Sequence, residues 1–116
     1  MLYRIGTMDE LSKTGIKLPE AVMADLVRST AALDREYGAA RDYLTCGGYS
    51  LIVESEDDLA QLKQIIDYDT HPCEWVTEIE GSGYISVLYL LNDDYSIVVY
   101  TTAAIACDIA WSGTED

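Results

Sequence analysis

The sequence predicts an α+β domain in which helices pack on one face of an antiparallel sheet of about four strands. Three observations support this prediction. Apolar residues recur at helical spacing between residues 19 and 37, and Ser55 precedes a second amphipathic segment. Beyond residue 73, β-rich runs alternate with two turn clusters, which is typical of a three-stranded C-terminal meander.

The 116 residues are expected to form a single small acidic domain that spans residues 1–116. Hydrophobic residues make up 49% and charged residues 24% of the chain, which excludes a disordered composition. No stretch approaches the roughly 18 apolar residues of a membrane span, and acidic residues begin too early for a signal-peptide core. We therefore expect a soluble, cytoplasmic protein.

Two helices are expected in the N-terminal third. Thr7 and Glu10 fit a T-x-x-E capping box, which predicts a short helix over residues 8–13 that Gly15 ends. The second helix is expected over residues 19–37. Its first residue is a proline, which suits that position because it has no amide proton to lose there. An apolar stripe then repeats every three or four residues up to a terminal glycine.

A strand and a third helix follow. Residues 49–53 have the composition of a short strand after a Gly-Gly turn. Ser55 then caps a helix whose first turn holds three acidic residues, where the helix dipole favours negative charge. This helix is expected to fade near Asp67.

The meander is expected to contain strands near residues 74–80, 84–91 and 95–101, joined by two three-residue loops. This spacing predicts one nearly continuous apolar face. Across the first turn Trp75, Thr77 and Ile79 would lie opposite Tyr89, Val87 and Ile85, and these would lie opposite Ile97, Val99 and Thr101. A slip of one residue would mix this face with glutamates.

The other face of the meander mixes carboxylates with apolar side chains, and it is the expected partner-binding surface. Its members are Glu74, Glu78, Glu80, Tyr84, Leu88, Leu90, Val98 and Tyr100. Either residues 102–111, which are ambiguous between helix and strand, cover this face or another chain does. An exposed apolar patch with a charged rim is the usual anatomy of an interaction site.

The charge of the chain restricts its partners. Seven basic residues stand against 21 acidic ones, a formal net charge of −14, and Lys63 is the only basic residue after residue 50. A protein with this much negative charge repels phosphate backbones and anionic membranes. Direct binding to nucleic acid or to a membrane is therefore not expected. A basic protein is the partner that electrostatics favours, and a second copy of the chain remains open.

The reactive side chains form no recognised motif. Cys46, Cys73 and Cys107 are an odd, scattered set, which suits a reducing cytoplasm, and His71 is the only histidine. Within residues 67–74, Asp67 and Asp69 offer oxygen ligands beside that histidine. An ordinary helix-to-strand loop is the favoured interpretation, and we expect no catalytic residue, metal or cofactor.

We therefore expect a non-catalytic intracellular interaction module that binds a protein partner or self-associates through the mixed acidic and apolar sheet face. One alternative is an acidic DNA-mimic inhibitor of a nucleic-acid-binding protein, and another is a small metal-dependent enzyme using residues 67–74. In its small size, its acidity and its lack of catalytic motifs, the chain is similar to accessory proteins of phages and mobile elements. Some of those imitate DNA to block nucleases. This likeness is one of composition and covers no motif.

Overall fold

The computed structural model describes residues 3–37, 47–66, 75–92, 95–102 and 105. These residues form three helices and a five-stranded mixed sheet, which confirms the α+β class. The elements, in chain order, are β1 (Tyr3–Ile5), α1 (Met8–Thr14), α2 (Glu20–Tyr37), β2 (Gly47–Val53), α3 (Glu56–Ile65), β3 (Trp75–Ile79), β4 (Tyr84–Asn92) and β5 (Tyr95–Thr102). None of the described helices combines the length and the apolar character that crossing a bilayer requires.

The strand order in the sheet is β1-β2-β5-β4-β3. The two central strands, β2 and β5, run parallel, and the other three pairs are antiparallel. The prediction of a purely antiparallel sheet of about four strands is therefore wrong. The fifth strand, β1, is only three residues long and has no alternating pattern that would announce it. The parallel pair joins strands that α3 and the β3–β4 hairpin separate along the chain, so no turn signal marks it.

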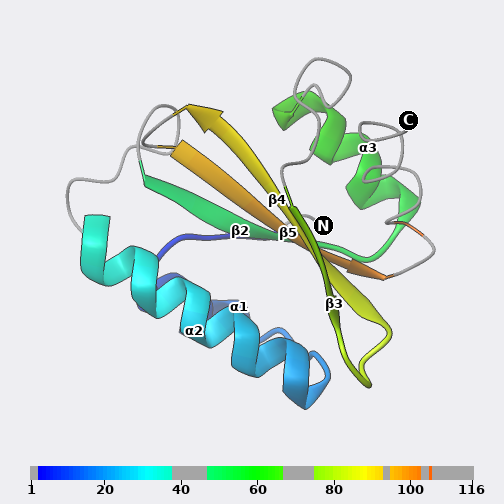
Figure 1. Ribbon diagram of the computed structural model, residues 1–116, viewed down its shortest axis with the longest axis horizontal. Coiled ribbons are helices and arrows are strands. Elements are labelled where there is room, and N and C mark those ends of the chain that lie inside the picture. Colours follow the sequence, from blue (N-terminus) through cyan, green and yellow to red (C-terminus); the bar gives the residue numbers. More distant parts are fainter. Residues whose placement is uncertain (1–2, 38–46, 67–74, 93–94, 103–104, 106–116) are drawn as a thin grey trace.

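Helices lie on both faces of the sheet, with α1 and α2 on one side and α3 on the other (Figure 1). The prediction of helices on a single face is therefore wrong. The α2-side cluster contains Ile5, Val22, Leu26, Ile52 and Tyr100. The α3-side cluster contains Tyr49, Leu51, Val53, Leu59, Leu62, Ile66, Val87, Tyr89, Ile97 and Val99. Both central strands contribute to both clusters, because their apolar residues run on without alternation, and such strands need cover on each face.

The helix starts follow the predicted chemistry. Thr7 and Glu10 form the complete capping box of α1, and Gly15 ends that helix in the left-handed region. Pro19 directly precedes α2, and its carbonyl oxygen accepts the Met23 N–H at 2.9 Å. At the start of α3 the Ser55 hydroxyl accepts the Asp58 N–H at 3.2 Å.

The pairing of β4 with β5 confirms the predicted register. Ile85 pairs with Thr101, Val87 with Val99, and Tyr89 with Ile97. The two-residue connection from Asn92 to Tyr95 is shorter than the predicted loop, but an irregularity in β4 between Leu90 and Asn92 supplies the missing residue. The register therefore stays as predicted over most of the two strands.

The pairing of β3 with β4 differs from the prediction by one residue. Ile79 pairs with Tyr84 rather than Ile85, and Trp75 pairs with Leu88 rather than Tyr89. The last pair of the ladder is Ile79 with Tyr84, so the connection holds four residues, 80–83, instead of the predicted three. Both glycines of this connection take positive φ, which glycine adopts without steric cost. As the sequence pattern warned, the slip brings a glutamate, Glu78, onto the face of Ile85 and Val87.

In the parallel pair, Gly48 of β2 lies directly against the backbone of β5 and has a φ of +120°. A Cβ built on this residue would collide with the carbonyl oxygen of Ser96 on β5. We expect Gly48→Ala to lower the free energy of unfolding by about 2 kcal/mol, measured by urea denaturation, because it adds a steric clash to backbone strain.

The matched control is Gly15→Ala. Gly15 also has positive φ (+63°), but a Cβ there would meet nothing within 4 Å. That substitution should cost about 1 kcal/mol, from left-handed strain alone. Equal losses in the two variants would contradict the close packing of β2 against β5 at Gly48.

Candidate functional site

The helical layers are offset across the sheet, and the offset leaves part of each sheet face open. On the α2 side, Ile5, Ile52 and Tyr100 are buried, so this layer covers β1, β2 and β5. Beyond them on the same side, the side chains of β4 and the end of β3 stay half-buried or exposed. We call this area the hairpin face. It comprises Ile79, Tyr84, Ser86, Leu88, Leu90 and Val98.

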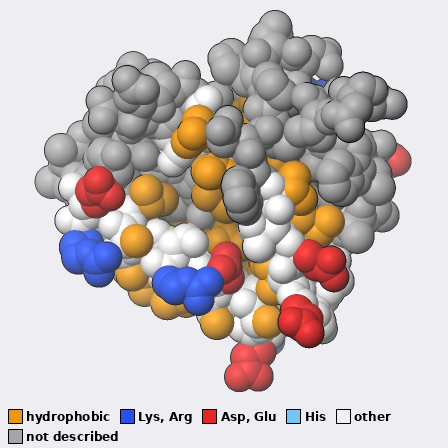
Figure 2. Space-filling view, viewed as in Figure 1, with side chains coloured by type: hydrophobic (Ala, Val, Ile, Leu, Met, Phe, Trp, Pro, Cys, Tyr) orange, Lys and Arg blue, Asp and Glu red, His pale blue; other side chains and the backbone are white. Residues whose placement is uncertain are grey.

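Leu90 is the most exposed large apolar side chain among the described residues, at 51%. Met8 and Val27 follow at 38% and 37%, and both lie on helices away from this strand. Figure 2 shows hydrophobic side chains in the middle of the molecule in this view and acidic side chains at the lower right, where the β3–β4 hairpin ends. On the hairpin face, Leu90 is therefore exposed and Leu88 half-buried, whereas Ile79, Tyr84 and Val98 are half-buried and pack against the α2-side cluster.

The structure brings together half of the eight residues that the sequence analysis assigned to the partner-binding surface. Tyr84, Leu88 and Leu90 alternate along β4, and Val98 pairs with Leu88 from β5. All four lie on the hairpin face. Ile79 joins them through its pairing with Tyr84, although the sequence pattern predicts it on the opposite, buried face. The two glycines of the Gly-Ser-Gly turn were the feature of the sequence that could have indicated this different β3–β4 register.

The other four predicted residues do not share that face. Glu78 is exposed on the α3 side, because it pairs with Ile85 of the α3-side cluster. Glu80 is exposed in the hairpin loop. Tyr100 is on the α2 side but fully buried, so it belongs to the core and presents nothing to a partner. Glu74 lies outside the described residues.

Two tyrosines tie the sheet to acidic side chains. The Tyr84 hydroxyl donates to the Glu54 carboxylate at 2.6 Å, so a glutamate from the end of β2 is fixed beside the hairpin face. The Tyr100 hydroxyl donates to Asp25 of α2 at 2.7 Å and lies 3.2 Å from the Ser29 hydroxyl. Burial raises the pKa of the Tyr100 phenol well above its usual range, and the Asp25 carboxylate adds to the rise.

The charges differ between the two sides of the hairpin face. Glu78, Glu80 and Glu54 are exposed near the hairpin end. Basic side chains lie over α2 in the space-filling view (Figure 2). Arg28 of α2 is paired with Asp25 on the same helix. The rim next to the hairpin loop is therefore acidic.

The reactive residues singled out in the sequence lie outside the described part of the chain. These are Asp67, Asp69, His71 and the three cysteines. Within the described residues, no group of three or more His, Cys, Asp or Glu side chains is placed to hold a metal ion. Of residues 103–111 only Ile105 is described, and it packs against the α3-side cluster rather than the hairpin face.

Comparison with known proteins gives no further guide to function. The sequence matches no protein-family model, no curated protein and no solved structure. Function is therefore inferred from the geometry and the charge of the described residues.

The bond between Tyr84 and Glu54 predicts a distinct alkaline behaviour. Burial, followed by the Glu54 carboxylate, raises the pKa of Tyr84 from its ordinary value of 10.0 to about 12. A raised folded pKa means that the stabilisation is complete below the unfolded pKa of about 10. It is lost as pH rises through the folded value. The free energy of unfolding should therefore fall more steeply over this pH range in the wild type than in Tyr84→Phe.

Glu54→Gln is the companion variant, because it keeps the phenol and removes the charge that opposes its ionisation. Ultraviolet titration should show that one tyrosine ionises at lower pH in Glu54→Gln than in the wild type. Identical titration curves for the two proteins would show that Tyr84 and Glu54 do not interact in solution.

Proposed function

We propose that this protein is a non-catalytic interaction module that binds a basic protein partner through the hairpin face. The observation that carries the proposal is the exposure of Leu90 beside the half-buried Leu88 and Val98. Ile79 and the Tyr84 ring lie further along the same face, beyond Ser86, and are half-buried against the α2-side cluster. Apolar patches that remain exposed on a folded protein commonly mark contact sites for other macromolecules.

The surroundings of this surface favour a protein partner with positive charge. Glu80 and Glu54 are exposed close to the hairpin face, and Glu54 is held there by Tyr84. An apolar centre inside a charged rim is the common anatomy of a protein–protein interface. The chain as a whole carries a net charge of −14, which accelerates encounter with a basic protein.

The same charge argues for a different protein rather than a second copy. A symmetric dimer through the hairpin face would bring two acidic rims toward each other, and like charges that meet at an interface oppose association. A basic partner would instead set Lys or Arg side chains against Glu54 and Glu80. Charge complementarity therefore selects the heterologous partner over self-association.

The edge of the sheet adds a second means of contact. β3 is the last strand in the sheet order, and no described strand pairs with its outer edge. Outward backbone N–H and C=O groups of an edge strand can pair with an extended segment of a partner. A segment bound there would lie next to the hairpin face and beside the exposed Glu78. We include this edge in the proposed contact surface.

The proposal is tested by affinity capture from source-cell lysate with three forms of the protein. Leu90→Ser removes the exposed apolar end of the hairpin face, and Val27→Ser removes a comparably exposed apolar side chain on α2. We expect the wild type and Val27→Ser to capture the same basic protein, and Leu90→Ser to capture much less of it. Equal capture by Leu90→Ser and the wild type would contradict the assigned surface.

Salt dependence and oligomeric state separate the proposal from its alternatives. A DNA mimic would bind through carboxylates, so its capture would fall steeply with salt but would not respond to Leu90→Ser. Sedimentation would show self-association as a dimer that Leu90→Ser dissociates. Either of these results would replace the proposed basic partner with the corresponding alternative.

A further inference from the structure

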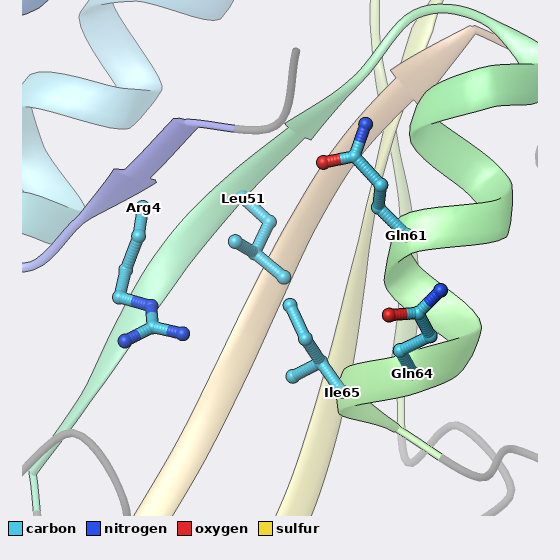
Figure 3. A pocket seen from close by; sticks show the side chains of 5 residues that line it. All are labelled: Arg4, Leu51, Gln61, Gln64 and Ile65. Carbon is cyan, nitrogen blue, oxygen red and sulfur yellow. The ribbon is translucent and has the colours of Figure 1, made fainter.

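A second open area lies on the opposite face of the sheet, between β1 and α3. It is a hollow of about 370 Å³, lined by Arg4, Leu51, Gln61, Gln64 and Ile65 (Figure 3). The hollow exists because the α3 layer buries side chains of β2, β5 and β4 and leaves Arg4 of β1 exposed. It lies within the lower part of the size range of small-molecule sites, which is about 300–1,000 Å³.

One end of the hollow is cationic. Arg4 is the one basic residue on the described strands, and it pairs with Leu51 across β1 and β2. Its guanidinium carbon lies 4.8 Å from the centre of the Tyr49 ring, a cation–π contact that holds the group at the sheet surface. A guanidinium carries five N–H donors, so it can keep contacts within the protein and still bind a ligand.

The other end of the hollow offers hydrogen-bond acceptors. The Gln61 amide nitrogen donates to Asp57 at 3.1 Å, which leaves the amide oxygen to face away from that carboxylate. In Figure 3 the amide oxygens of Gln61 and Gln64 lie on the side of Leu51 and Ile65. Between the two polar ends, the buried Leu51 and the half-buried Ile65 form an apolar floor.

We propose that this hollow binds a small organic carboxylate. The carboxylate would bond to the Arg4 guanidinium, and the apolar body would rest on Leu51 and Ile65. A hydroxyl or N–H group at the far end would donate to the glutamine oxygens. Arginine and carboxylate are geometrically matched, because two parallel N–H groups can meet the two carboxylate oxygens.

The charge around the hollow favours one negative charge over two. Arg4 is the only charged residue among the described residues that line it, so a second negative charge would find no second cation among them. The net charge of −14 adds a general repulsion that a dianion feels more strongly. A monocarboxylate therefore fits the hollow better than a phosphate ester.

The test is a titration of the full chain with 4-hydroxyphenylacetate, followed by amide NMR. We expect saturable shifts at Leu51, Gln64 and Ile65. Binding should weaken by at least about tenfold in Arg4→Gln, because a charge-assisted contact is lost. The neutral isostere 4-hydroxyphenylacetamide should show a similar loss against the wild type.

Two further variants keep the outcome interpretable. Lys63→Gln removes an exposed cation from α3 that does not line the hollow, and it should leave binding unchanged. Gln64→Ala shortens an exposed side chain at the far end of the hollow, so it should fold normally and weaken binding by removing one acceptor for the ligand's hydroxyl. Equal binding of the acid and the amide, or no shift at these residues, would overturn the proposal.

Discussion

The parallel pairing of β2 with β5 is the constraint on which the rest of the structure depends. The two strands run side by side from Gly47 and Tyr95 to Val53 and Thr101, and Gly48 lets their backbones approach closely at one end. Both strands place apolar side chains on both faces of the sheet, so each face needs its own cover. The α1–α2 pair supplies that cover on one side and α3 on the other. A sheet with one solvated face would have left the apolar side chains of that face, such as Ile52 and Tyr100 on the α2 side, in water.

The offset between the two helical layers links the fold to both proposed binding areas. Each layer spans the central strands, but α1 and α2 extend toward β1 whereas α3 extends toward β4. The uncovered remainder is the hairpin face on one side and the hollow beside Arg4 on the other. The two areas differ in chemistry, since the first is apolar with an acidic rim and the second has one cation and two amides. A protein surface suits the first, and a small anion suits the second.

Interactions between residues close together in the sequence could be predicted, but the pairing of strands far apart in the sequence could not. The Thr7–Glu10 capping box and the Ser55 cap are interactions over three residues, and the pairing of β4 with β5 follows from one short turn. The parallel central pair depends on residues almost fifty positions apart, which leave no local signal. Its indirect signal was the unbroken apolar runs around Leu51 and Val99, which are typical of strands covered on both faces. At the candidate site, the shared face of Leu88, Leu90 and Val98 could be predicted because it follows from the β4–β5 pairing. The face of Glu78 was predicted wrongly, because the β3–β4 register depends on the conformation of two glycines.

The central claim is that β2 and β5 are parallel neighbours, and interstrand NOEs measured by NMR test it most directly. The structure predicts contacts between Tyr49 and Ile97 at one end of the pair and between Val53 and Thr101 at the other. Both residue numbers should therefore increase together along the ladder. Contacts in which one number rises while the other falls, such as Tyr49 with Thr101, would show antiparallel strands. That result would contradict the two-layer cover and both binding areas that follow from it.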